Sequence, residues 1–403
     1  MNKSTNFTGQ PVFTQLLSYL HRPLIQSIAT KQKSDHYTKR FSTYGHLVTM
    51  LYSVFNNCDS LREVTTGLLA WEERISHLGI NFHPRRSTLS DANRRRSEKV
   101  FEEIYLALFA KYKHFLSDSR SSSKKLYVFD STTITLLKEI LKGAGRSNLN
   151  GKRKGGIKVH TLMDHKQAVP KMIRFSAAAA NDSQFLKEVD LPTGSVLVFD
   201  RGYPDYRSYN RFSQQKITWV TRLRKNASFD SIQDLEVSDF NRKRGVLSDQ
   251  LIVMGHNLNK KAIKVKSRLI QYKDSKTNKT FQFITNNTNL SALTIAQYYK
   301  KRWKIELLFK QLKQNYPLKS FLGDNENAIK IQIWTTLIAN LIVQIIRNLS
   351  KTKLSFSNMV AMIRVHIGTY IHLFNFIRNP EKALRRSQLK NEFRDIQYPL
   401  FEP

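Results

Sequence analysis

The chain of 403 residues contains a single cysteine, Cys58. One thiol cannot form an intramolecular disulfide bond, and a structural zinc site usually needs several cysteine ligands, so neither feature is expected. The first ten residues also lack the apolar core that a signal peptide requires. We therefore expect a protein of the reducing cytoplasm.

Acidic residues are few relative to basic ones. Lys and Arg number 66 against 31 Asp and Glu, which gives a formal net charge of +35. Solubility does not need so large an excess, so the sequence predicts a polyanionic partner, most simply DNA or RNA. An anionic membrane is the alternative, but the basic residues are spread along the chain rather than gathered beside one apolar segment. For DNA in a prokaryotic cell, association with the nucleoid is expected.

An uninterrupted apolar run of membrane-spanning length is also missing. The most apolar stretch, residues 331–346, contains Gln332, Asn340 and Gln344 and is short for a membrane span. We predict a buried helix there and no membrane partner. Hydrophobic residues make up 40% of the chain, which is typical of a folded protein with a sizeable core.

The N-terminal part, residues 10–118, has apolar residues at helical spacing. Within it the arginine-rich segment 84–96 predicts a helix that Ser87 or Ser90 would cap. Arg94 and Arg95 would lie on its exposed face. In so cationic a chain we favour DNA contact for this helix, and a merely solvated basic helix is the alternative.

After a polar segment at 118–125, the pattern changes to short apolar runs. Runs without alternation are typical of strands buried on both faces, as in the centre of a mixed α/β sheet. The strand candidates are residues 126–130, 156–163, 169–175, 195–200 and 217–223. A helix is expected after Pro204. From about 225 to 287, short runs between polar turns predict a β-rich insertion.

The segment 299–313 lacks Gly and Pro and predicts one helix. At about 100° per residue, four polar side chains share one narrow face, and an apolar stripe occupies another. The polar face carries Tyr299, Arg302, Glu306 and Lys313, and the apolar stripe carries Ile305, Leu308 and Leu312. A single carboxylate thus lies among basic groups and a phenol. The alternative for Arg302 and Glu306 is an ordinary i,i+4 surface pair.

Two predicted strands end alike, with Val-Phe-Asp at Asp130 and again at Asp200. If these strands are parallel neighbours, both carboxylates emerge at one edge of the sheet, and Glu306 completes a third vertex. Three carboxylates favour Mg²⁺, with Mn²⁺ able to replace it, and two such ions about 4 Å apart can activate a nucleophile at a phosphodiester. Each aspartate taken singly is more often a helix cap or a turn former.

The four polar residues of segment 299–313 match the pattern YxxRxxxExxxxxxK. This pattern resembles the signature of the insertion-sequence-four family of DDE transposases, to which the Tn-five and Tn-ten enzymes belong. Asp-Ser-Thr-Thr from Asp130 and Asp-Arg-Gly-Tyr from Asp200 resemble the first and second acid motifs of that family. Residues 41–63 and 87–96 are similar to the helical N-terminal domain of one branch.

The resemblance implies an α/β fold with an RNase H-like mixed-sheet catalytic core, interrupted by a β-rich insertion, and a helical N-terminal domain. The implied domains are a helical DNA-binding domain at 1–120, the core at 121–224 and 289–350, the insertion at 225–288 and a C-terminal helical region at 351–403. The implied metal ligands are Asp130, Asp200 and Glu306.

The implied activity is cut-and-paste transposition: hydrolysis at the element's end, a hairpin intermediate and strand transfer. The partners would be double-stranded DNA of the transposon ends and the target, held by a homodimer. Two rival functions remain open. One is a DNA-binding derivative without catalysis, and the other is an RNase H-like nuclease that cuts without joining strands.

The resemblance also implies a set of DNA contacts. Tyr299, Arg302 and Lys313 would contact phosphates near the scissile bond. Trp303 would stack on a base flipped from the duplex, with core packing as its alternative. Arg201 would bind a phosphate or pair with an acid. A basic loop at 152–154 would lie along DNA or be solvated.

Overall fold

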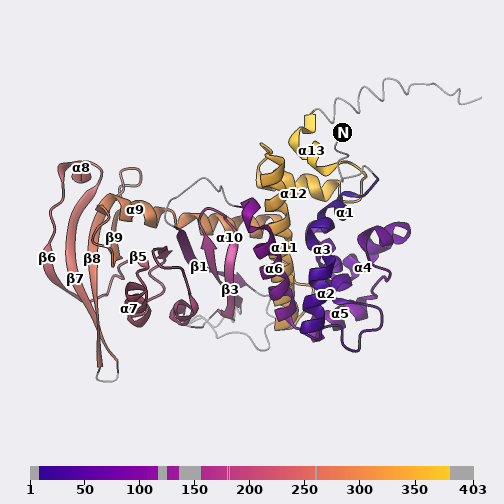
Figure 1. Cartoon of the computed structure of the whole chain (residues 1–403), viewed down its shortest axis with the longest axis horizontal. Coiled ribbons are helices and arrows are strands. Elements are labelled where there is room, and N and C mark those ends of the chain that lie inside the picture. Colours follow the sequence, from indigo (N-terminus) through magenta and orange to yellow (C-terminus); the bar gives the residue numbers. More distant parts are fainter. Residues whose placement is uncertain are drawn as a thin grey trace, which may run out of the picture. The chain divides into compact units, whose positions relative to one another are not determined.

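The computed structural model describes residues 9–116, 125–135, 156–178, 180, 182–258 and 261–381. The chain divides into two compact units (Figure 1). A helical unit joins Met1–Leu116 to Gln311–Pro403, and a sheet unit comprises Ser117–Lys310. The domain boundaries expected from the sequence stay predictions, and the basic loop at 152–154 lies outside the described residues.

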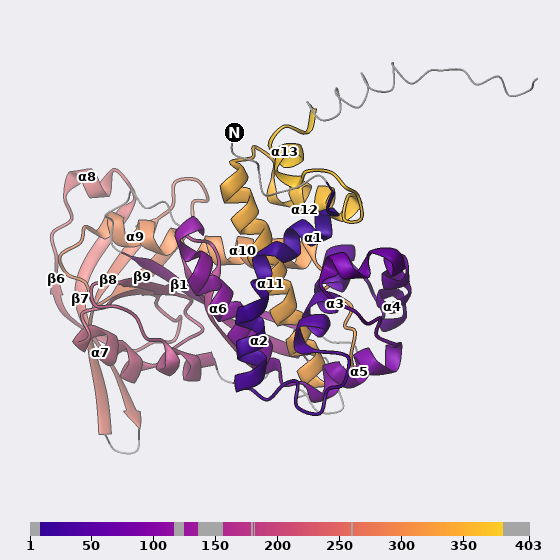
Figure 2. The same cartoon turned by 45° about the vertical axis from the view of Figure 1, so that its right-hand side comes forward.

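The helical unit confirms the helical reading of residues 10–118. Its helices before the sheet unit are α1 (Val12–Leu17), α2 (Arg22–Lys31), α3 (Thr43–Asn56), α4 (Leu61–Leu69), α5 (Arg86–Arg95) and α6 (Glu98–Leu116). Those after it are α11 (Glu326–Ser350), α12 (Phe356–Val365) and α13 (Leu373–Arg378). Helix α11 packs against both α3 and α6, as Figure 2 shows, so the N-terminal and C-terminal parts of the chain share one core.

Helix α11 is the apolar stretch predicted to be a buried helix, and the structure confirms this. Within the described residues it alone is long and apolar enough to cross a membrane, yet 89% of its apolar window is buried inside the protein. Its polar side chains have partners: Gln332 Nε2 donates to the carbonyl oxygens of Pro317 (2.7 Å) and Ser320 (2.9 Å), and Asn340 accepts from Gln311 (3.0 Å). Buried amides that are hydrogen-bonded in this way are compatible with a protein core.

The capping prediction for the arginine-rich helix was wrong. Helix α5 begins at Arg86, its N-cap is Arg85, and no side chain caps it. Ser87 and Ser90 therefore lie inside the helix rather than before it. Within this helix Asn93 is buried, and its Oδ1 lies 2.7 Å from Nε2 of the buried His46.

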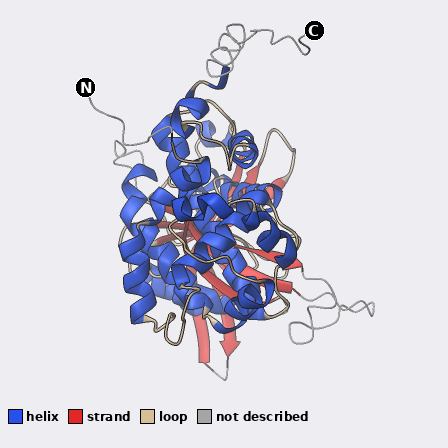
Figure 3. Cartoon of the chain, turned by 90° about the vertical axis from the view of Figure 1, so that its right-hand side faces the viewer, coloured by secondary structure: helices blue, strands red, loops and turns tan. Residues whose placement is uncertain are grey.

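The sheet unit is built on one nine-stranded mixed sheet of order β3-β2-β1-β4-β5-β9-β8-β7-β6, drawn in red in Figure 3. The strands are β1 (Leu126–Thr135), β2 (Gly156–Asp164), β3 (Pro170–Ala177), β4 (Val196–Phe199), β5 (Thr218–Arg222), β6 (Phe229–Asp234), β7 (Val246–Leu258), β8 (Lys261–Lys273) and β9 (Thr280–Thr285). Strands β1, β4 and β5 are parallel to one another, and the other pairings are antiparallel.

The predicted β-rich region is present, but it does not form a separate sheet. Strand β9 pairs with β5, with Val220 opposite Thr285, so β6–β9 continue the sheet that β1–β5 begin. This continuation leaves no open edge at β5, where unpaired backbone groups would invite pairing with another chain.

Helices α7 (Tyr206–Gln214), α8 (Asp239–Arg242), α9 (Ala292–Lys300) and α10 (Trp303–Asn315) complete the sheet unit, and the last turn of α10 passes into the helical unit. Helix α7 follows Pro204 as predicted, with Asp205 as its N-cap. Its Tyr209 ring stacks on Trp219 of β5 at 4.6 Å between centroids. Strand β4 is buried along its whole length, which confirms an interior strand there. Strand β3, predicted from a similar run, is instead the edge strand of the sheet and is only partly buried.

Candidate active site

Asp130 and Asp200 come from neighbouring parallel strands, as the sequence predicted. The predicted strand end at Asp130 is wrong, because β1 continues to Thr135 and pairs with β2 along this length, whereas Asp200 directly follows the end of β4. Strands β1 and β4 pair in parallel with Phe129 opposite Phe199, so the residue that follows each phenylalanine lies at the same level of the sheet. Both phenylalanines are fully buried and belong to one hydrophobic cluster, so the two strands turn the same face toward a shared core. The side chains of Asp130 and Asp200 remain 14% and 28% exposed.

The single helix predicted over 299–313 is wrong: α9 ends at Lys300 and α10 begins at Trp303 (Figure 1). The connecting turn is tight, with the amide of Arg302 donating to the Tyr299 carbonyl at 2.9 Å. The two helices bury different stripes, one led by Ile295 and the other by Ile305. One continuous helix cannot turn both stripes toward the core, and the helix is interrupted by a turn at Lys301 and Arg302.

Arg302 joins two of the three acids across the turn. Its guanidinium pairs with Oδ2 of Asp130 on β1 and with Oε1 of Glu306 on α10. The i,i+4 ion pair between Arg302 and Glu306 therefore exists, but the same guanidinium also binds Asp130, so it is not an isolated surface pair. The Arg302 side chain is only 12% exposed, so the ion pairs are partly shielded from water, and their geometry is held by the surrounding chain.

Asp200 is held by two other side chains. Its Oδ1 accepts hydrogen bonds from Arg222 Nη2 (2.9 Å) and from the Tyr299 hydroxyl (3.1 Å). The Arg222 guanidinium also lies over the Tyr299 ring, 5.4 Å from its centroid, within the range of a cation–π interaction. Tyr299 thus places its hydroxyl in the acid cluster rather than at the surface.

Arg222 is a site residue that the sequence analysis missed. It ends β5, the third parallel strand in the order β1-β4-β5. The signal was present in the sequence: the strand candidate at 217–223 carries Arg222 near its end, where the first two runs carry an aspartate. A cation at that position neutralises the carboxylate of the adjacent strand.

The electrostatics of the acids differ. Burial raises the pKa of Asp130 to about 6; the Arg302 charge and the Ser131 amide lower this pKa, whereas Asp200 and Glu306 raise it. Burial also raises the pKa of Asp200, but the hydrogen bond and charge of Arg222 outweigh it and hold that pKa below its usual value. Asp200 and Glu306 thus act on Asp130 as like charges, and the guanidinium groups of Arg302 and Arg222 supply positive charge beside the three acids.

The chemistry of these residues fits a hard divalent cation. The three acids offer only oxygen donors, which Mg²⁺ and Mn²⁺ prefer. In the part of the chain that the structure describes, no three His, Cys, Asp or Glu side chains already form a metal-binding group. The Arg302 guanidinium instead provides the positive charge between Asp130 and Glu306, the place where a cation bound by the acids would be needed.

The other predicted DNA contacts occupy different surroundings. Trp303, the first residue of α10, is 58% exposed, so the core-packing alternative for this side chain is wrong. Arg201 is exposed, and within the described residues it has no ion pair, although its carbonyl accepts a hydrogen bond from Arg224 (3.1 Å). Lys313 is an exposed residue in the last turn of α10.

Arg94 and Arg95 lie in the last turn of α5, in the helical unit. Both are exposed, as the sequence predicted. The next arginine, Arg96, is buried: one Nη2 donates to the carbonyl of Phe41 (2.7 Å) and to Asp35 (3.2 Å). The three consecutive arginines at the end of the segment therefore divide into a structural residue, Arg96, and an exposed pair.

Comparison with known proteins assigns these residues to a family. A family described as "Transposase DDE domain" matches residues 121–342, which include all three acids. A second family, described as a domain of unknown function (DUF4372), matches residues 8–81 of the helical unit.

Individual proteins agree with the family match. "Putative transposase y4zB" of Sinorhizobium fredii is 29% identical over 268 residues, 66% of this chain and 73% of that protein. "Putative transposase for insertion sequence element IS4SA" of Synechocystis sp. is 26% identical over 270 residues, 64% and 71% of the two chains. Among solved structures, the piggyBac transposase in a synaptic complex with hairpin DNA matches with a TM-score of 0.43 and 12% sequence identity. The match covers 96% of this chain and 84% of that chain, but this similarity is too low to support an argument. Because the transposase family match spans more than half of the chain, this protein is a DDE transposase of the insertion-sequence-four family.

Proposed function

We propose that this transposase moves its insertion sequence by a cut-and-paste reaction, in which Asp130, Asp200 and Glu306 hold Mg²⁺, or Mn²⁺ in its place. Enzymes of this family use divalent metal ions, which would polarise the attacking water or hydroxyl and stabilise the leaving oxygen of the phosphodiester. The observation that carries the proposal is the parallel pairing of β1 with β4, which brings Asp130 and Asp200 to one level, together with the link from Asp130 through Arg302 to Glu306.

The remaining side chains of the cluster position the acids and the DNA. Arg222 and the Tyr299 hydroxyl fix the orientation of Asp200 by holding one of its oxygens. Arg302 is the cation nearest to the acids, and we propose that it neutralises charge on the phosphate near the scissile bond, with Lys313 and Arg201 contacting phosphates further along. Guanidinium groups suit this role because they bind phosphate oxygens in a fixed planar geometry.

We assign the core to an RNase H-like fold over 121–224 and 289–350, with residues 225–288 as the insertion. In support, the first five strands form a mixed sheet in which the antiparallel β1–β3 adjoin the parallel β4 and β5. Residues 1–120 would bind DNA, with Arg94 and Arg95 among the contacts, and 351–403 would form the C-terminal region. A homodimer would hold two transposon ends and the target duplex.

The direct test is incubation of the protein with the end DNA of its own element and Mg²⁺, followed by mapping of the products. The proposal expects nicks at the element boundary, hairpin ends and molecules joined to target DNA. Nicks without joined products would identify a nuclease instead. Binding of the ends without any cleavage would identify a DNA-binding derivative.

Exposure of Trp303 supports the proposal that this ring stacks on a flipped base. Replacing it by alanine (Trp303→Ala) should slow hairpin formation or resolution by about tenfold or more, because stacking on an aromatic side chain contributes about 1–3 kcal/mol per base. First-strand nicking should change less. Single-turnover assays on labelled ends measure each step. Trp303→Phe, which keeps an aromatic ring, is the matched control, and equal slowing of every step would contradict the stacking role.

The net charge of +35 predicts strongly salt-dependent DNA binding. Between 50 and 200 mM salt, affinity for the end duplex should fall by about 10³-fold or more, since each neutralised phosphate releases counterions. Fluorescence anisotropy of a labelled duplex measures this dependence. A titration with sucrose at matched osmolarity should leave affinity unchanged, and a flat response to salt would refute the polyanion interpretation.

A further inference from the structure

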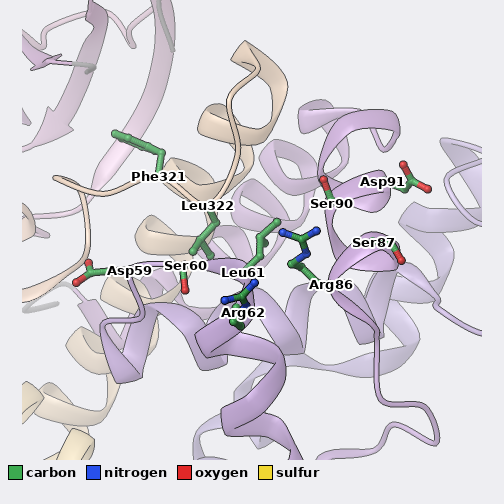
Figure 4. Close-up of a pocket in the computed structure, with 10 residues that line it drawn as sticks. All are labelled: Asp59, Ser60, Leu61, Arg62, Arg86, Ser87, Ser90, Asp91, Phe321 and Leu322. Carbon is green, nitrogen blue, oxygen red and sulfur yellow. The ribbon is translucent and has the colours of Figure 1, made fainter. Parts of the chain in front are cut away.

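The helical unit contains a pocket that the acid cluster does not use. Its volume is about 650 Å³, and it lies between the start of α4, the start of α5 and the segment at Phe321 and Leu322 that precedes α11 (Figure 4). This volume is within the range of small-molecule sites and exceeds what a single phosphate ion needs. All of the lining residues belong to the helical unit.

The charged side chains of this pocket are arranged unequally. In Figure 4 the guanidinium groups of Arg62 and Arg86 extend into the space between α4 and α5, whereas the carboxylates of Asp59 and Asp91 lie at opposite ends and point away from it. Both arginines are exposed, and neither forms an ion pair with any residue that the structure describes. Two unpaired guanidinium groups facing one cavity favour an anionic ligand.

The backbone adds to this preference. Helix α4 has a side-chain cap: the Ser60 hydroxyl accepts from the Glu63 amide (3.1 Å), and the Glu63 carboxylate accepts from the Asp59 amide (2.8 Å). Helix α5 has no side-chain cap, so the first amides of a ten-residue helix keep their capacity to donate to an anion. Ser87 and Ser90, in the first turns of the same helix, are also among the residues that line the pocket.

One wall of the pocket is apolar and held in place. Leu322 is buried, and its amide donates to Oε1 of Gln332 on α11 at 2.9 Å. The half-buried Phe321 lies beside it. A ligand that combines negative charge with an uncharged, partly apolar portion suits such a wall, and a sugar–phosphate unit has both.

We propose that this pocket binds a phosphodiester of DNA, with Arg62 and Arg86 on the phosphate and Phe321 and Leu322 against the sugar or base. The inference rests on the proposed function, because it takes DNA as the partner. It goes beyond that function by assigning a backbone-binding subsite in the helical unit to residues at the beginnings of α4 and α5, apart from the exposed pair Arg94 and Arg95 at the end of α5.

The test compares Arg62→Gln, Arg86→Gln and the double variant with the wild-type protein and with Arg40→Gln. Arg40 is an exposed arginine of the same unit that does not line the pocket, so its substitution removes the same charge elsewhere. Affinity for the end duplex is measured by anisotropy in EDTA, which prevents cleavage. We expect about a tenfold or greater loss of affinity for the double variant and a logarithmic salt slope smaller by about 1, since both arginines hold one phosphate and a lost phosphate contact changes the slope by about 0.9. Arg40→Gln should lose much less.

A second measurement needs no variant and so does not depend on folding. Phenylglyoxal modifies accessible arginines, and mass spectrometry reports each site. Duplex DNA should protect Arg62 and Arg86 but not Arg40. If inorganic phosphate at the same phosphate concentration protects them equally well, the pocket is a free-anion site and the DNA assignment is refuted.

The two proposals can fail separately. If wild-type protein binds end DNA with a steep salt slope while the double variant binds equally well and DNA gives no protection, only the pocket assignment is refuted. If the wild-type protein does not bind DNA, the proposed function fails and the pocket assignment fails with it.

Discussion

Replacing any one of the three acids by its amide, as Asp130→Asn, Asp200→Asn or Glu306→Gln, is expected to abolish Mg²⁺-dependent cleavage of element-end DNA. The amide keeps the size of the side chain but removes the charge that a hard cation requires. Loss of about 4 kcal/mol of transition-state stabilisation would lower the rate by about 10³-fold. Binding of the end duplex should survive, because the charge excess that drives it is untouched. Gel analysis of cleavage and anisotropy of binding measure the two effects.

The matched control for this series is Asp164→Asn. Asp164 is the last residue of β2, and its Oδ1 accepts a hydrogen bond from the Lys166 amide (2.8 Å) in the following turn. It forms no hydrogen bond with Arg302 or Arg222. The control should cleave normally. If Asp164→Asn were inactive while one of the three amide variants cleaved at the wild-type rate, that residue would be removed from the active site.

Removal of Arg302 should weaken the metal-free protein and make it respond more strongly to metal. Arg302→Gln leaves Asp130 and Glu306 without their shared countercharge. Breaking a buried ion pair costs about 3–5 kcal/mol, but Glu306 is 33% exposed, so solvent screening reduces the expected loss to about 2 kcal/mol. That corresponds to a fall in Tm of roughly 4–8 °C. Calorimetry in EDTA measures it.

Adding Mg²⁺ or Mn²⁺ distinguishes this role from simple structural damage. A divalent ion replaces the missing charge, so its addition should raise the Tm of Arg302→Gln by more than that of the wild-type protein, in which the guanidinium competes for the same carboxylates. Arg302→Lys, which keeps one positive charge, should fall between the two. Arg201→Gln, at an exposed neighbouring arginine, should behave like the wild type. Equal Tm values in EDTA for the wild type and Arg302→Gln would contradict the bridging role.

Parts of the site follow from local patterns in the sequence. The runs that end at Asp130 and Asp200 are uninterrupted and apolar, which indicates strands buried on both faces, and two such strands with the same ending are natural neighbours in one sheet. The buried stripe at Ile305, Leu308 and Leu312 follows from helical spacing in the same way. The apolar character of a run and the spacing of its apolar residues are local properties of the sequence, so they indicate a buried face without knowledge of what packs against it.

The same reasoning failed where packing overrode the pattern. Residues 299–313 have one helical period, yet the chain turns at Lys301 because α9 and α10 bury different stripes. The helical spacing of Tyr299 and Arg302 still predicts their proximity, because the Arg302 amide donates a helix-like hydrogen bond to the Tyr299 carbonyl within the turn. The start of α5 was also misplaced: the helix begins at Arg86 without a side-chain cap, although serines that could cap it follow at Ser87 and Ser90.

By itself the sequence determined the basic character of the chain, the strands that carry two of the acids, the buried helix α11 and the family signature. Only the tertiary structure decided that Arg302 pairs with Asp130 across 172 residues of chain, that Arg222 holds Asp200, and that β6–β9 extend the first sheet rather than forming another. The physical reason is that periodicity reports which face of an element is buried, whereas the partner of a charged side chain is set by which distant segments the core brings together.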